Sequence, residues 1–87
     1  MKMSENKLAK ATINLRYPKK RTASVVNKAI SPDNYKAPDG IDIQTFQEGS
    51  EITINIRCKK GIGSLTATLD DLLACISTVE KTIADLD

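Results

Sequence analysis

The stretch ITINIRCK, residues 52–59, alternates an apolar and a polar side chain at every position. A period of two places its isoleucines and cysteine on one face of a β-strand and its polar side chains on the other. The isoleucine face has to be buried, whereas the opposite face suits water. The stretch therefore predicts a strand in a sheet that is covered on one side.

The same alternation recurs before this strand and predicts two more strands. Residues 41–46 alternate, and residues 47–50, with the sequence QEGS, predict a hairpin turn into the strand just described. Near the start of the chain, residues 9–17 place alanine, isoleucine, leucine and tyrosine on one face, until Pro18 ends the strand. Three strands with one apolar face each can share a single core.

Two other segments have the period of a helix. Residues 19–30 place Ala23, Val26 and Ile30 on one face, which predicts a short amphipathic helix. After the strand that ends near residue 59, a flexible turn is expected at residues 60–63. Ser64 is then expected to be the N-cap of a second, longer helix.

The longer helix carries a heptad seam whose apolar residues are spaced alternately four and three apart. The seam consists of Leu65, Leu69, Leu72, Ile76, Val79, Ile83 and Leu86. Leu73 widens it on one side. Asp70 and Asp71 are expected early in this helix, where its dipole favours anions.

The order of elements is therefore β-α-β-β-α. The simplest fold is of the α+β class, with a three-stranded antiparallel sheet and two helices packed on one face. Residues 1–8 are expected to form a flexible arm, and residues 9–87 a single domain.

The long helix is expected to extend past the sheet. Residues 52–58 span roughly 23 Å as a strand, and residues 65–86 span roughly 33 Å as a helix. The end of the seam, at Val79, Ile83 and Leu86, then needs other cover. A second copy of the chain or another protein's helix would supply it; a fold-back of the arm, through Met3 and Leu8, is the alternative.

Composition argues against catalysis and against a cofactor. Of the 87 residues none is histidine, which removes the usual proton shuttle and the commonest metal ligand. The two cysteines form no CxxC pair and are expected to be reduced. No apolar run approaches the roughly 18 residues of a membrane span. No secretory signal is evident either, so we expect a cytoplasmic, non-catalytic protein without a cofactor.

Charge is distributed unevenly along the chain. Residues 1–36 carry nine basic and two acidic side chains, whereas residues 37–87 carry four basic and nine acidic ones. A basic region can attract the phosphates of RNA, although such charges are often only solvated surface. The predicted RNA contacts are Lys19, Lys20, Arg21, Arg57 and Lys59.

The start of the long helix also carries a family resemblance. The sequence GSLTATLDDLL, residues 63–73, resembles the signature that opens the last helix of the Pcc family, the small subunits of the KEOPS (EKC) complex. AISPDN at residues 29–34 and PDG at residues 38–40 support the resemblance, which covers about residues 9–83. The signature positions carried over are Ser64, Leu65, Leu69, Leu72 and Leu73.

The resemblance implies a dimerising scaffold. Family members pair with themselves or with a paralogue, and they bind the N-terminal helical region of the catalytic subunit. That subunit makes N6-threonylcarbamoyladenosine in tRNA, so tRNA is expected as a partner within the complex, and a membrane is not. The predicted partner or dimer interface is Leu65, Leu69, Leu72, Leu73, Ile76, Val79 and Ile83.

Two other functions stay open at this point. The chain could be a stand-alone RNA-binding module that uses its basic face, since residues 1–36 carry a net charge of +7. It could also be a transcription cofactor, because family members have been described as such. No segment of the sequence predicts a DNA-recognition helix with base-reading residues.

Overall fold

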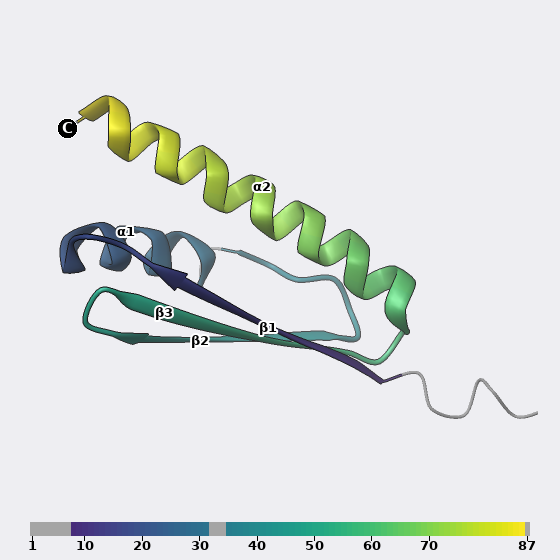
Figure 1. Ribbon diagram of the computed structural model, residues 1–87. Helices are drawn as coiled ribbons and strands as arrows, with labels where there is room; N and C mark the ends of the chain where they lie inside the picture. The colour runs from purple at the N-terminus through teal and green to yellow at the C-terminus, as the bar shows by residue number, and fades with distance from the viewer. Residues whose placement is uncertain (1–7, 32–34, 87) are drawn as a thin grey trace, which may run out of the picture.

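Both helices lie on one face of a three-stranded antiparallel sheet, as Figure 1 shows. The computed structural model describes residues 8–31 and 35–86. In chain order the elements are β1 (Ala9–Arg16), α1 (Lys20–Ile30), β2 (Ile41–Glu48), β3 (Glu51–Cys58) and α2 (Ile62–Leu86). The predicted β-α-β-β-α order and α+β class are confirmed. Apart from Leu8, the predicted arm at residues 1–8 lies outside the described residues.

The strand with the clearest alternation is the central one. The sheet has the order β1-β3-β2, and both pairings are antiparallel. Ile54 pairs with Ile13 of β1 on one side and with Thr45 of β2 on the other. The apolar side chains of β3 are fully buried at Ile52, Ile54, Ile56 and Cys58. Burying each isoleucine stabilises the fold by about 1.5–3 kcal/mol, which makes this strand the centre of the core.

The hairpin between β2 and β3 is tighter than the sequence predicts. β2 continues to Glu48, so the turn contains only Gly49 and Ser50. Gly49 has φ +62°, the sign that a type II′ hairpin turn requires at its first position. Gln47 pairs with Ile52 in the strand, and its Nε2 donates hydrogen bonds to Ser24 Oγ in α1 and to the Gly49 carbonyl, each at 2.9 Å.

The start of α2 differs from the prediction. The helix begins at Ile62, and the Leu65 N–H donates to the Gly61 carbonyl at 3.2 Å. Lys59 and Lys60 form the turn and Gly61, with φ +97°, follows it, so Gly63 is helical and Ser64 is not the N-cap. The first turn of α2 contains no acidic residue. Asp70 and Asp71 therefore lie too far along the helix for the dipole interaction that we expected, which fades after the first turn.

The far end of α2 obtains part of its cover from α1. Val79 and Ile83 are partly buried and pack against the core, and both face α1 across a groove described below. Leu8 precedes the opposite end of β1 from Tyr17, about 26 Å along an eight-residue strand. The described part of the predicted arm is therefore remote from Val79 and Ile83.

Candidate protein-binding surfaces

The heptad seam is divided between the core and the surface. Leu65, Leu72 and Ile76 are buried within the single chain, each at most 3% exposed. Leu69, Val79 and Ile83 are partly buried against them, whereas Leu73 is 46% exposed. Of the seven predicted interface residues, the structure thus leaves Leu73 and, in part, Leu69, Val79 and Ile83 accessible to a partner.

One open apolar surface follows β1. The inward-facing residues of this edge strand, among them Ala11, Ile13 and Leu15, are only partly buried, although their neighbours on β3 are fully buried. Leu73 projects from α2 on the same side as Glu80, two turns further on, which contacts Tyr17 at the end of β1. We call Ala11, Ile13, Leu15 and Leu73 the β1 ledge.

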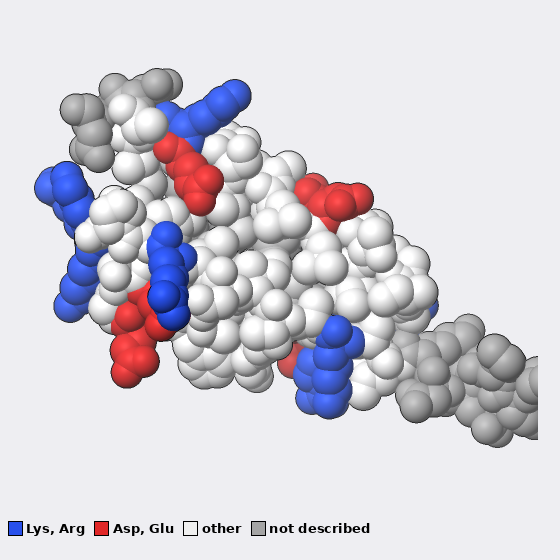
Figure 2. All heavy atoms as spheres, in the orientation of Figure 1, with Lys and Arg blue, Asp and Glu red and all other residues white. Residues whose placement is uncertain are grey.

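Charge is sparse over the ledge. Figure 2 shows that the middle of the face in view, over β1 and the flank of α2, is largely uncharged, with basic and acidic groups towards its ends. β1 is also an edge strand, so its outer backbone groups have no strand partner among the described residues. The unpaired backbone edge of β1 and the exposed apolar side chains beside it together form a surface to which a further strand can be added.

The other flank of α2 borders a groove of about 500 Å³ that runs between the two helices. We call it the α1–α2 groove. Its lining is apolar or hydroxyl-bearing along most of its length, with two basic residues from the start of α1. The lining residues are Lys19, Arg21, Thr22, Val25, Ala29, Thr78, Val79, Thr82 and Ile83.

The threonines of the groove present less polarity than their composition implies. Thr78 Oγ1 donates to the Ala74 carbonyl, and Thr82 Oγ1 donates to the Thr78 carbonyl, each at 3.0 Å. Hydroxyls bonded back to the preceding turn are satisfied within the helix. The α2 wall of the groove therefore has less hydrogen-bonding capacity than its two threonines would otherwise give it.

Two tyrosines hold α2 from opposite sides. The Tyr17 hydroxyl donates to Glu80 Oε2 at 2.6 Å, and the Tyr35 hydroxyl donates to Asp71 Oδ2 at 2.7 Å. The two carboxylates project from opposite sides because they are about two and a half turns apart. Burial, then the hydrogen bond and charge of Asp71, raise the pKa of Tyr35 to about 12. Burial and Glu80 likewise raise the pKa of Tyr17 well above its ordinary value.

The raised pKa values predict a loss of stability in alkali. A tyrosine whose pKa is higher folded than unfolded stabilises the fold fully below the unfolded pKa of about 10. For Tyr35 that contribution is lost as the pH rises through about 12. The chain has two tyrosines and no tryptophan, so tyrosinate absorbance reports on these residues alone. Titration of both residues near pH 10 in the folded protein would contradict the prediction; urea-unfolded protein and the two single Tyr→Phe variants are the controls.

The five predicted tRNA contacts do not form one patch. Lys19 and Arg21 line the α1–α2 groove, beside the end of β1. Arg57 and Lys59 lie at the other end of the sheet, in a hollow of about 310 Å³ with Asp42. An eight-residue strand of about 26 Å separates the two ends.

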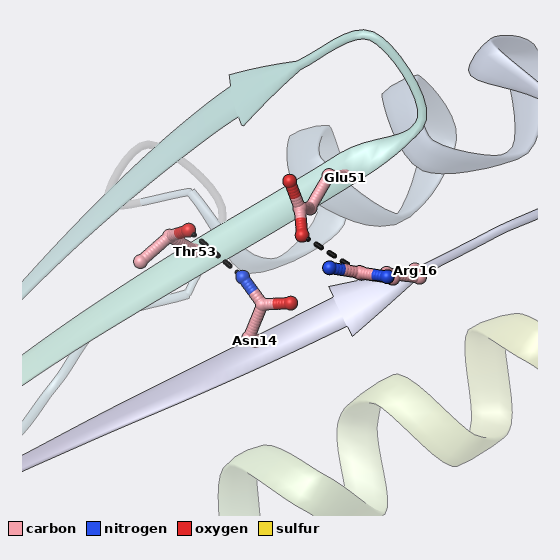
Figure 3. A network of polar contacts seen from close by, with 4 residues as sticks. All are labelled: Asn14, Arg16, Glu51 and Thr53. Carbon is pink, nitrogen blue, oxygen red and sulfur yellow. Dashed lines mark hydrogen bonds and ion pairs between the residues drawn. The ribbon is translucent and has the colours of Figure 1, made fainter.

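Polar side chains of β1 and β3 bond to one another across the exposed face of the sheet. Thr12 Oγ1 donates to Asn55 Oδ1 at 3.0 Å, and Figure 3 shows Asn14 bonded to Thr53 and Arg16 paired with Glu51. Asn14 Nδ2 lies 3.2 Å from Thr53 Oγ1, and Arg16 Nε lies 2.9 Å from Glu51 Oε2. A ladder of this kind is typical of a solvated face.

Comparison with known proteins identifies the family. The sequence profile described as "Transcription factor Pcc1" matches residues 10–84, which is most of the chain. The chain belongs to the Pcc1 family. The resemblance drawn from residues 63–73 is thereby confirmed.

Solved structures agree with the fold of this Pcc1-family chain. A chain in the crystal structure of the binary complex Gon7-Pcc1 superposes with a TM-score of 0.77 and 16% identity, over 91% of this chain and 96% of that one. A search of the curated proteins gives no match. Family membership supports a KEOPS-related scaffold role and suggests a non-catalytic subunit.

The family signature is mainly structural in this Pcc1-family chain. Leu65 and Leu72 belong to the core, Leu69 packs against it, and Leu73 reaches the β1 ledge. Sequence reasoning missed the α1 side of the groove. The signal was present, because Thr22, Val25 and Ala29 recur at helical spacing beside the buried face of α1.

Among the described residues, no group of three or more histidine, cysteine or acidic side chains is placed to hold a metal ion. No stretch of the sequence was expected to approach a membrane span, but by length and composition residues 62–84 of α2 are apolar enough to cross a membrane; one such helix is weak evidence of a span. In its most apolar 18-residue stretch 22% of the residues are buried, and Ile62 and Leu73 are the exposed large apolar side chains of α2 among the described residues.

Proposed function

We propose that this chain is a non-catalytic scaffold subunit of a KEOPS-type complex that makes N6-threonylcarbamoyladenosine in tRNA. It pairs with a second small subunit, another copy or a paralogue, and it binds the N-terminal helical region of the catalytic subunit. The cytoplasmic location expected from the sequence is part of this proposal. Two free cysteines, Cys58 and Cys75, agree with a reducing compartment.

The observation that carries the proposal is that α2 has open apolar surface on both flanks. The β1 ledge lies on one flank, and the α1–α2 groove lies on the other. A second small subunit can add a strand at the ledge, while a helix of the catalytic subunit occupies the groove. Because the surfaces are separate, one chain can make both contacts at the same time, which is what a scaffold requires.

Stand-alone RNA binding has less support from the geometry. Of the predicted tRNA contacts, Lys19 and Arg21 lie at one end of the sheet and Arg57 and Lys59 at the other, and side chains of β1 and β3 on the face between them bond to one another. A contact with tRNA within the assembled complex remains part of the proposal.

Gel filtration with light scattering tests the proposal. The chain alone is expected at about twice its mass of 9.5 kDa if it pairs with itself. Mixed with the purified catalytic subunit, it is expected to elute in a joint peak of larger mass. Separate elution at micromolar concentrations of both proteins would contradict the scaffold role.

A further inference from the structure

We infer that the α1–α2 groove selects a partner helix that carries acidic side chains at the end nearest the start of α1. Lys19 and Arg21 are the residues that select it. The inference rests on the proposed function, because it specifies the chemistry of the segment that occupies the groove. It also reassigns two of the predicted tRNA contacts to protein recognition.

The body of the groove fits the apolar face of a helix. Val25 and Ala29 form the α1 wall, and Val79 and Ile83 lie opposite on α2. The α2 wall also includes Thr78 and Thr82, whose hydroxyls are bonded within the helix. Helix-in-groove recognition uses such a surface, with apolar anchors one turn apart on the partner.

The mouth of the groove carries net positive charge. Lys19 and Arg21 line it, and neither forms an ion pair among the described residues. Glu80 borders a neighbouring hollow with Lys19 and keeps its negative charge while it accepts the hydrogen bond from Tyr17, so one anion stands against two cations here. A partner carboxylate near these cations would be drawn in at longer range and would fix the orientation of the incoming helix.

The basic start of α1 is also costly to the helix itself. Its first turn has no acidic residue, and Lys19 at the N-cap makes no side-chain hydrogen bond. Cations at this end oppose the helix dipole. Positive charge at an unfavourable position beside an apolar groove is explained when an acidic partner occupies that groove.

The test measures binding of the full catalytic subunit by calorimetry at two salt concentrations. The single variant Arg21→Glu, and the double variant that combines Lys19→Glu with Arg21→Glu, are each expected to weaken binding about tenfold or more at low salt. The difference from the wild type should shrink at high salt, where charges are screened. Reversing the acidic residues of the partner's N-terminal helical region to lysine, one at a time, should restore binding to Arg21→Glu for at least one of them.

Lys20→Glu is the matched control. Lys20 lies in the same helical turn and gives the same charge change, but it does not line the groove. It is expected to change the affinity less than threefold. All of these side chains are exposed, so circular dichroism should show an unchanged fold.

The outcomes separate this inference from the proposed function. Val25→Asp places a charge in the apolar wall at a position that is 46% exposed, so it tests the groove without affecting the core. If Val25→Asp weakens binding and Arg21→Glu does not, the groove is the docking site, but the inference that the partner helix carries acidic side chains there is wrong. Loss of tRNA binding alone in Arg21→Glu would overturn the inference in favour of RNA. Absence of wild-type binding would overturn the proposed function itself.

Discussion

An Ile54→Ala variant is expected to lose about 2–5 kcal/mol of unfolding free energy. Ile54 lies at the middle of the central strand, is fully buried, and has strand neighbours on both sides. Removing its side chain leaves a cavity that rigid neighbours cannot fill. Since small domains are stable by only roughly 5–15 kcal/mol, a large part of the population should unfold under mild denaturant.

Urea unfolding followed by circular dichroism measures this loss, and Phe46→Ala is its control. That substitution removes a larger side chain from the same sheet, but Phe46 is 55% exposed on the open face. We expect it to cost less than about 1 kcal/mol. Equal losses in the two variants would mean that the isoleucine face of the sheet is not the centre of the core.

A Leu73→Asp variant is expected to abolish pairing through the β1 ledge. Burying a leucine in an interface contributes about 1.5–3 kcal/mol, and an aspartate would bring an unpaired charge into the same place. The affinity should fall about 100-fold or more, so light scattering at a fixed concentration should report a monomer. The fold should survive, because Leu73 is 46% exposed in the single chain.

The companion variant is Ala74→Asp, which introduces the same charge at the next position, on the exposed back of α2. It should leave the mass of the assembly unchanged, and a monomer in this variant would mean that the ledge does not explain the loss of pairing.

Ile76 is unsuitable as a test of pairing, although it belongs to the predicted interface. It is only 3% exposed, so an aspartate would unfold the chain before it could report on binding.

The fold was predictable because each strand and helix has a clear apolar period. The strand at residues 52–58 was predicted almost to its observed ends, since alternation without interruption has one physical meaning. The start of α2 was not, because a glycine can either make a turn or continue a helix. In the folded chain Gly61 has a positive φ and Gly63 is helical, and the packing of α2 on the sheet determines which glycine adopts which conformation.

The candidate site was less predictable for a different reason. A heptad seam shows that a face must be covered, but it does not say whether the cover comes from the same chain. The sheet covers Leu72 and Ile76 in this protein, whereas Leu73 beside them stays open. The sequence also did not reveal that Thr78 and Thr82 add little polarity to the groove, because their hydroxyls bond to carbonyls of the preceding turn only once the helix has formed.

The strand order has a consequence for how the chain is synthesised. β3 is the central strand and also the last one to be translated. Arg16 precedes its partner Glu51 by 35 residues, so it can pair only after Glu51 has been synthesised. Until β3 leaves the ribosome, β1 and β2 have no strand to pair with and α1 has no completed sheet to cover. Folding is therefore expected to be a late, all-or-none event rather than a stepwise one, and a nascent chain that stalls before residue 51 would expose every apolar strand face to chaperones.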